Sequence, residues 1–250
     1  SGTVLRGSIV NVTGVAATTG APSAQRYGAN GLLSAGLVIE ATGAVDLRGL
    51  GGVGRGVHLS SDDSVTSGAS TLRITGVTRS SALEGLLLES ASIGDADQSG
   101  DIVLGAGNAE IQLAPGNVDG ADSIALAGSA IRTTGTIALA PAGLSADATQ
   151  ITRRDDADIR VGTAVERGFE LAVADLQAID PSTHGVAIGS VTHRGRISVD
   201  DAQLPAFNLS LQNEGAGSEG IDLLKGMAMP GRRLALATAG PIAAGGPIIA

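Results

Sequence analysis

Two consecutive stretches of the chain, residues 56–76 and 85–105, repeat one arrangement of apolar residues and turns. Each begins with Gly and an apolar-x-apolar triplet, passes through a polar turn to a short apolar segment, and closes with a longer alternating segment that ends in Gly. Three apolar positions recur: Val57 and Leu86 are 29 positions apart (86 − 57), Val65 and Ile93 are 28 apart (93 − 65), and Leu72 and Ile102 are 30 apart (102 − 72). A repeat of about this length indicates a solenoid or another repeat architecture.

Each apolar segment alternates as a short strand does when one of its faces is buried. Val57 and Leu59 point inward with His58 outward, and the next long segment alternates in the same way around an outward Arg73. Such strands are too short to be stable alone, so each must bury its apolar face against the next repeat. The pattern therefore predicts an all-β fold, a single-stranded parallel β-helix with three short strands and about 29 residues per coil.

The same pattern continues along most of the chain and predicts one β-helix segment over residues 1–250. Ile9 and Val38 are again 29 positions apart (38 − 9). Irregular loops are expected near 18–30 and 145–158. In 164–175, alternation of Phe169, Leu171 and Val173 favours a strand over a helix.

Both ends of the sequence lack an amphipathic helix that would cap a solenoid. We therefore expect a segment of a longer rod, or a rod that stacks end to end on copies of itself. Residues 234–250 carry no charge, but Gly and Pro interrupt them and they are short for a spanning helix. This stretch is interpreted as a final apolar coil.

The amino-acid composition suits the narrow interior of a β-helix. The chain has two Phe, one Tyr and no Trp, so its core must be built from Val, Ile, Leu and Ala. Its net charge of −9 makes nucleic acid an improbable partner, because phosphate contacts need a basic surface. The absence of Cys excludes disulfides and thiolate chemistry and is compatible with export.

The repeated Gly-apolar-x-apolar and Thr-apolar-x-apolar-Thr-Gly units, typified by 56–59 and 71–76, resemble the shaft repeats of filamentous haemagglutinin-type two-partner-secretion exoproteins. This family includes bacterial adhesins and contact-dependent inhibition proteins. The resemblance covers 31–139 well and 159–236 loosely, and does not include the Asn-Pro-Asn secretion domain. It implies a right-handed β-helix, export through an outer-membrane β-barrel transporter, a secreted or cell-surface location, and binding to a host or bacterial surface receptor.

One turn resembles the first half of an EF-hand calcium loop. Its candidate ligands are Asp95, Asp97, Ser99 and Asp101. The bidentate Glu expected at the twelfth position is replaced by Ala106. The turn is therefore interpreted as a solvated connection in preference to a calcium site, and no cofactor is expected.

An enzymatic alternative rests on Asp155, Asp156 and His184, which resemble part of the polygalacturonase site on the same fold. Paired carboxylates supply the general acid and the base in inverting glycosidases. The flanking Asn-Thr-Asp and Arg-Ile-Lys motifs of that site are missing, and few aromatic residues are present to stack on sugars. His58 and His193 are interpreted as exposed residues at outward positions.

The sequence thus favours a non-catalytic structural or adhesive shaft of a secreted or surface-displayed bacterial exoprotein, for cell adhesion, biofilm formation or toxin delivery. Two alternatives stay open, a β-helical polysaccharide-degrading enzyme and a self-polymerising extracellular filament. Outward Leu87 and Val103 hint at an apolar surface patch.

Overall fold

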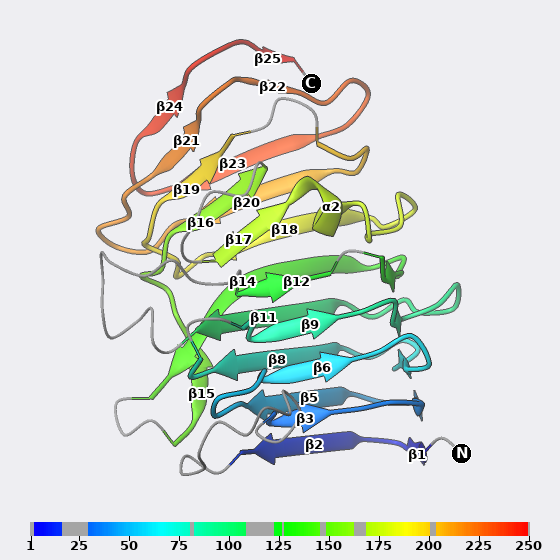
Figure 1. Cartoon of the computed structure of the whole chain (residues 1–250). Helices are drawn as coiled ribbons and strands as arrows, with labels where there is room; N and C mark the ends of the chain where they lie inside the picture. The colour runs from blue at the N-terminus through cyan, green and yellow to red at the C-terminus, as the bar shows by residue number, and fades with distance from the viewer. Residues whose placement is uncertain are drawn as a thin grey trace.

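The computed structural model describes residues 3–16, 30–80, 83–108, 123–126, 128–145, 149–162, 169–200 and 204–249. Of these described residues, 50% lie in strands and 2% in helix, and the strands form mainly parallel sheets. Figure 1 shows the strands stacked from β1–β3 at the N-terminal end to β23–β25 at the C-terminal end. The expected all-β fold with parallel pairing is confirmed.

Four sheets of three or more strands run along this stack. The main sheet has the order β2 (Val10–Val15), β5 (Val45–Leu50), β8 (Leu72–Thr78), β11 (Ile102–Asn108), β14 (Thr136–Leu144), β18 (Gly185–Ser190), β20 (Leu209–Asn213) and β23 (Leu234–Thr238). The second sheet holds β1 (Thr3–Gly7), β4 (Leu37–Ala41), β7 (Ser64–Thr66), β10 (Ser92–Ile93) and β13 (Ala130–Ile131). The third holds β3 (Leu32–Leu33), β6 (Val57–Leu59), β9 (Leu86–Leu88) and β12 (Ile124–Ala125).

The C-terminal part continues with a fourth sheet. Its order is β17 (Phe169–Ala172), β16 (Ile159–Gly162), β19 (Ile197–Val199), β21 (Ile221–Leu223) and β24 (Ile242–Ala244). A separate pair joins β22 (Met227–Ala228) to β25 (Ile248–Ile249). From β1 to β11 every strand pairs with the third strand after it along the chain, so successive strands contribute in rotation to the second, main and third sheets.

The register agrees with the repeat read from the sequence in the N-terminal part. The three predicted pairs are all observed: Val57 with Leu86, Val65 with Ile93, and Leu72 with Ile102. The expected pairing of Ile9 with Val38 is wrong. Val38 pairs with Val4, and Ile9 lies in the turn between β1 and β2 with 65% of its surface exposed.

The period of about 29 residues does not hold in the C-terminal part. Val186 pairs with Leu209 after 23 positions (209 − 186), and Leu209 pairs with Leu234 after 25 (234 − 209). Ile137 pairs with Val186 after 49 positions (186 − 137), because β15, β16, β17 and a short helix are inserted there. The strands keep their register while the connections between them change in length, as surface loops do.

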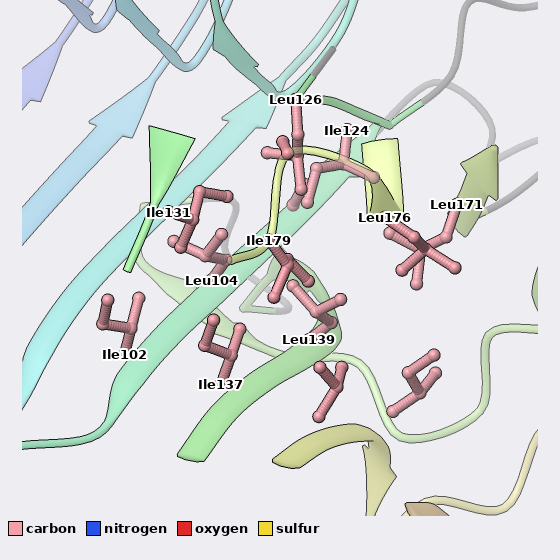
Figure 2. Packing of buried hydrophobic residues seen from close by; sticks show 14 of the residues in the cluster. Ile102, Leu104, Ile124, Leu126, Ile131, Ile137, Leu139, Leu171, Leu176 and Ile179 are labelled. Atoms are coloured by element: carbon pink, nitrogen blue, oxygen red, sulfur yellow. The ribbon is translucent and has the colours of Figure 1, made fainter. Parts of the chain in front are cut away.

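Inward side chains form columns that fill the interior. One column in the main sheet contains the fully buried Leu47, Ile74, Leu104, Leu139, Ile188 and Leu211. Figure 2 shows Leu104 and Leu139 from this column packed beside Ile131 and Ile179. Phe169 and Phe207 are both buried, and the rest of the core is aliphatic with two Met, as the composition predicts.

Glycines form the corner between the main sheet and the third sheet. A Cβ on Gly49 would lie 1.9 Å from the carbonyl oxygen of Gly56, and a Cβ on Gly76 would lie 2.1 Å from that of Gly85. Only a residue without a side chain permits this approach. The repeated Gly residues therefore allow the chain to turn from one sheet to the next.

The irregular segment expected near 145–158 contains an antiparallel hairpin. The end of β14 pairs with β15 (Ile151–Arg153). A small outer cluster, with Leu144 and Ile151 against Leu50 and Val77, holds the hairpin to the outer face of the main sheet. Figure 1 shows β15 running back beside the earlier strands. The loop expected near 18–30 lies outside the described residues except for Asn30, whose side chain accepts a hydrogen bond from the Arg55 amide at 2.6 Å.

The strand expected through Val173 ends at Ala172, where the helix α2 (Val173–Leu176) begins. Asp175 causes the change, because its carboxylate accepts hydrogen bonds from the amide of Ala172 at 3.0 Å and from that of Leu126 at 2.6 Å. The residues of 234–249 form β23, β24 and β25. Across the described ranges, the helices fall short of the length and hydropathy that a membrane span requires.

Candidate functional site

A groove of about 470 Å³ lies on the outer face of the main sheet, beside the hairpin of β14 and β15. Its floor is built from outward positions of neighbouring strands. In-register pairing stacks those positions into columns, so Val103, Ala138 and Ala187 follow Arg73 in one column. Gly105 and Ala140 follow Thr75 in the next. These small residues keep the floor low.

Three arginines reach the groove from separate parts of the chain. Arg48 pairs with Asp46 at 2.7 Å, and this hydrogen bond raises the pKa of the guanidinium. Arg153 lies 3.4 Å from Asp155. Arg73 is exposed and has no hydrogen bond or ion pair with any described residue. The groove therefore presents three guanidinium groups and two neighbouring carboxylates, Asp46 and Asp155, and Asp46 is also the in-register neighbour of Arg73.

Neutral polar groups complete the groove. They come from Thr75, Thr152, Ser190 and Gln212. Among the described residues that line it, none is acidic and none is aromatic. A surface of guanidinium, hydroxyl and amide groups around a low apolar floor suits an anionic ligand with an extended shape.

A polar cluster lies where the groove meets the end of β18. The Ser190 hydroxyl donates to the Asp155 carboxylate at 3.5 Å, and the Asp155 backbone carbonyl accepts from the Gly195 amide at 3.1 Å. His193 is only 1% exposed and its Nε2 has no hydrogen-bond partner. Burial lowers the pKa of His193, while the carboxylates of Asp155 and Asp158 act in the opposite direction.

The structure does not bring together Asp155, Asp156 and His184, the residues of the enzymatic alternative. Asp155 contacts Ser190 at the end of β18, whereas His184 precedes the start of that strand. Six residues of extended strand separate the two positions by about 20 Å. Asp156 pairs with Arg154 at 3.3 Å.

The histidine beside Asp155 is His193, which the sequence analysis placed at an exposed position. That prediction is wrong, because the turn after β18 folds inward: the His193 amide donates to the Ser190 carbonyl at 3.1 Å, and its carbonyl accepts from the Gly215 amide at 2.8 Å. No periodic signal in the sequence marks this turn. Only the spatial neighbourhood identifies His193.

His58 is also buried, with 7% exposure, so its expected exposure is wrong. It lies in register between Leu33 and Leu87, and its Nε2 is 3.0 Å from a carboxylate oxygen of Glu89. The apolar patch expected from Leu87 and Val103 is not one surface. Leu87 belongs to the third sheet and Val103 to the main sheet.

The four residues of the calcium candidate lie in the turn before β11. Asp95 accepts hydrogen bonds from the amides of Asp97 and Gln98 at 2.8 and 2.9 Å, as a turn-forming Asp does. Asp101 accepts from the Thr136 amide of the next coil at 2.9 Å. The Ser99 amide donates to the Gly68 carbonyl. The carboxylates of Asp95 and Asp101 thus accept hydrogen bonds from backbone amides, and the preference for a solvated turn over a calcium site stays a prediction.

Comparison with known protein families, curated proteins and solved structures found no match. Within the described ranges, no three His, Asp or Glu side chains converge in a way that could hold a metal ion. The groove and the adjoining Asp155–His193 cluster are the candidate site that the geometry itself defines.

Proposed function

We propose that the chain is a right-handed parallel β-helix that serves as a structural segment of an extended fibre. Pairing of every strand with the third strand after it, from β1 to β11, supports a wound chain in preference to separate sheets. We assign right-handed winding because connections between parallel strands of one sheet are almost always right-handed. The same winding continues with shorter coils through β23 and β24.

The observation that carries the proposal is the pair of open strand edges. Pairing runs without a break along the main sheet from β2 to β23, and no strand among the described residues pairs with the outer side of β2 or of β23. The last strands of neighbouring sheets are also open: Ile242 on β24 and Ile248 and Ile249 on β25 are about half exposed, as is Val4 on β1 at the other end. Exposed apolar strand edges favour pairing with further strands.

The fibre we propose is exported and works at the cell surface. The repeat resembles that of filamentous haemagglutinin-type exoproteins, whose shafts carry adhesive or toxin-delivery modules. An outer-membrane β-barrel transporter would export it and a host or bacterial surface receptor would bind it. The lack of Cys suits a chain that crosses membranes unfolded.

A second candidate is a self-polymerising filament, which the same open edges favour. Electron microscopy of the purified chain at rising concentration tests it, and we expect rods that lengthen by stacking. Ile249→Lys should abolish the lengthening by placing charge on the edge. Val53→Lys, at a residue of similar exposure on a lateral turn, should not.

The structural role is tested against the enzymatic alternative by incubation with polygalacturonate and assay of reducing ends. A structural segment releases none. Release that is lost in Asp155→Asn would reject the structural role. Particles that stay single at all concentrations would reject the filament.

A further inference from the structure

The groove on the main sheet has a positively charged lining, although the molecule is acidic. The chain has 25 acidic and 16 basic residues, yet the charged residues that line the groove within the described ranges are Arg48, Arg73 and Arg153 alone. Asp46 and Asp155 neutralise two of these arginines from outside the lining. Arg73 has no ion pair with a described residue, although Asp46 lies in register beside it, so the three arginines outnumber the two carboxylates and give the groove a net attraction for an anion.

The groove is elongated along the stack of strands. Its lining begins at β5 with Arg48 and ends at β20 with Gln212, so it crosses six strands of the main sheet. Five inter-strand steps correspond to about 24 Å, the length of about seven residues of extended polypeptide. The floor is low over β14 and β18, where Ala138, Ala140 and Ala187 leave room for the backbone of such a chain, and the arginines lie toward β5 and β8.

The chemistry of the lining distinguishes a peptide from a saccharide. Aromatic residues, on which sugar rings stack, are absent from the described lining. Guanidinium groups form paired hydrogen bonds with carboxylates, and an extended peptide presents alternate side chains to the same side. An acidic peptide can thus direct carboxylates to Arg73 and Arg153 and small apolar groups to the alanine floor.

We propose that this groove binds an extended acidic peptide segment of a partner protein, about seven residues long, with Arg73 as its principal charge contact. The flanking Thr75, Thr152 and Gln212 add neutral hydrogen bonds. The hairpin of β14 and β15 forms one wall. The inference does not depend on the fibre role, because the groove lies on the lateral face and not at the open strand edges.

The test measures binding of fluorescently labelled heptaglutamate to the full chain by anisotropy at low and high salt. We expect saturable binding that weakens with added salt, because exposed charge contacts are screened. Heptalysine, heptaglutamine and tetragalacturonate are the comparison ligands. Heptaglutamate should bind at least about tenfold more tightly than each of them, which corresponds to about 1.4 kcal/mol.

The decisive variant is Arg73→Gln, because the Arg73 side chain has no hydrogen bond or ion pair with a described residue whose loss would disturb the fold. We expect a five- to tenfold weaker affinity, which corresponds to about 1–1.4 kcal/mol, the net contribution of one hydrogen bond at an exposed site. Arg233→Gln is the matched control: Arg233 is exposed, its side chain is without an ion pair, and it lies outside the groove lining. Both variants should keep the circular dichroism spectrum and urea midpoint of the parent.

Three results would overturn the proposal. They are equal affinity for heptaglutamate and heptaglutamine, equal loss in the two arginine variants, and tighter binding of tetragalacturonate than of heptaglutamate. The last would assign the groove to an acidic saccharide. None of them bears on whether the rods stack, so failure here is distinct from failure of the fibre role.

Discussion

Substitution of Gly76 by Ala tests whether the glycine corner limits how closely the coils approach. A Cβ on Gly76 would lie 2.1 Å from the Gly85 carbonyl oxygen and 2.9 Å from the Val57 amide nitrogen, where ordinary contact begins at 3.4 Å. The deficit at the oxygen is 1.3 Å (3.4 − 2.1). Both atoms belong to backbone, so no side chain can rotate away.

The same clash falls on a hydrogen bond between coils. The Val57 amide donates to the Gly85 carbonyl at 2.9 Å, and the added methyl group would press on both partners. Overpacking costs about 1–3 kcal/mol and a strained buried hydrogen bond about another 1–3 kcal/mol. The lower entropy of the unfolded Ala chain offsets about 0.5–1 kcal/mol. We expect Gly76→Ala to lower the free energy of unfolding by about 2–4 kcal/mol.

Urea denaturation followed by circular dichroism measures the effect. Because solenoids can unfold in stages, the midpoint and slope are compared together. Gly7→Ala is the matched control, since its Cβ would meet nothing closer than 3.4 Å and should shift stability by less than about 0.5 kcal/mol. If both variants unfold at the same midpoint, the corner is not sterically limiting and the reasoning is refuted.

Three further predictions concern the core, a strained turn and a buried histidine. Ile74→Ala, at a fully buried position, should lower the free energy of unfolding measured by urea denaturation by about 2–5 kcal/mol. Arg73→Ala beside it should lower it by less than about 0.5 kcal/mol, and equal losses would contradict the inward column. Ser90 is the one non-glycine with positive φ (62°) among the described residues, so Ser90→Gly should raise the thermal midpoint, equivalent to about 0.5–1 kcal/mol, and a lower midpoint would contradict it. Because the pKa of His193 is lowered in the folded chain, the unfolded chain protonates this histidine more readily than the folded chain does. The free energy of unfolding is therefore highest above the unfolded pKa near 6.5 and falls as the pH drops through the folded pKa. His193→Gln should therefore lose less stability than the parent between about pH 7.5 and pH 5, and an equal loss would exclude His193 as the cause.

The N-terminal coils were predictable because two independent signals coincide there. Alternation placed Val57 and Leu72 inward, and glycines at near-constant spacing fixed where each strand ends. Shifting a strand by one residue would expose its entire apolar set, so the register follows from the pattern. Ile9 was misplaced because position 9 falls in a turn, where alternation carries no information.

The C-terminal coils were less predictable because their turns change length while their strands do not. The pairing of Val186 with Leu209 keeps the inward alternation but not the spacing. A fixed period therefore predicts the wrong pairing partners for the strands after β14. The hairpin inserted at this point also follows no repeat, since Leu144 and Ile151 pack on the outer face and not in the core.

The groove could not be predicted, because its arginines become a site only when the hairpin is in place. Arg48, Arg73 and Arg153 each occupy an outward position, and outward arginines are ordinary on a strand surface. What distinguishes them is a wall supplied by β15, and β15 is held there by contact of Ile151 with the outer cluster. The groove therefore depends on packing between segments about a hundred residues apart, which a one-dimensional repeat cannot encode. It follows that Ile151→Ser, which weakens the wall without removing a charge, should reduce heptaglutamate affinity alongside Arg73→Gln if the hairpin organises the site.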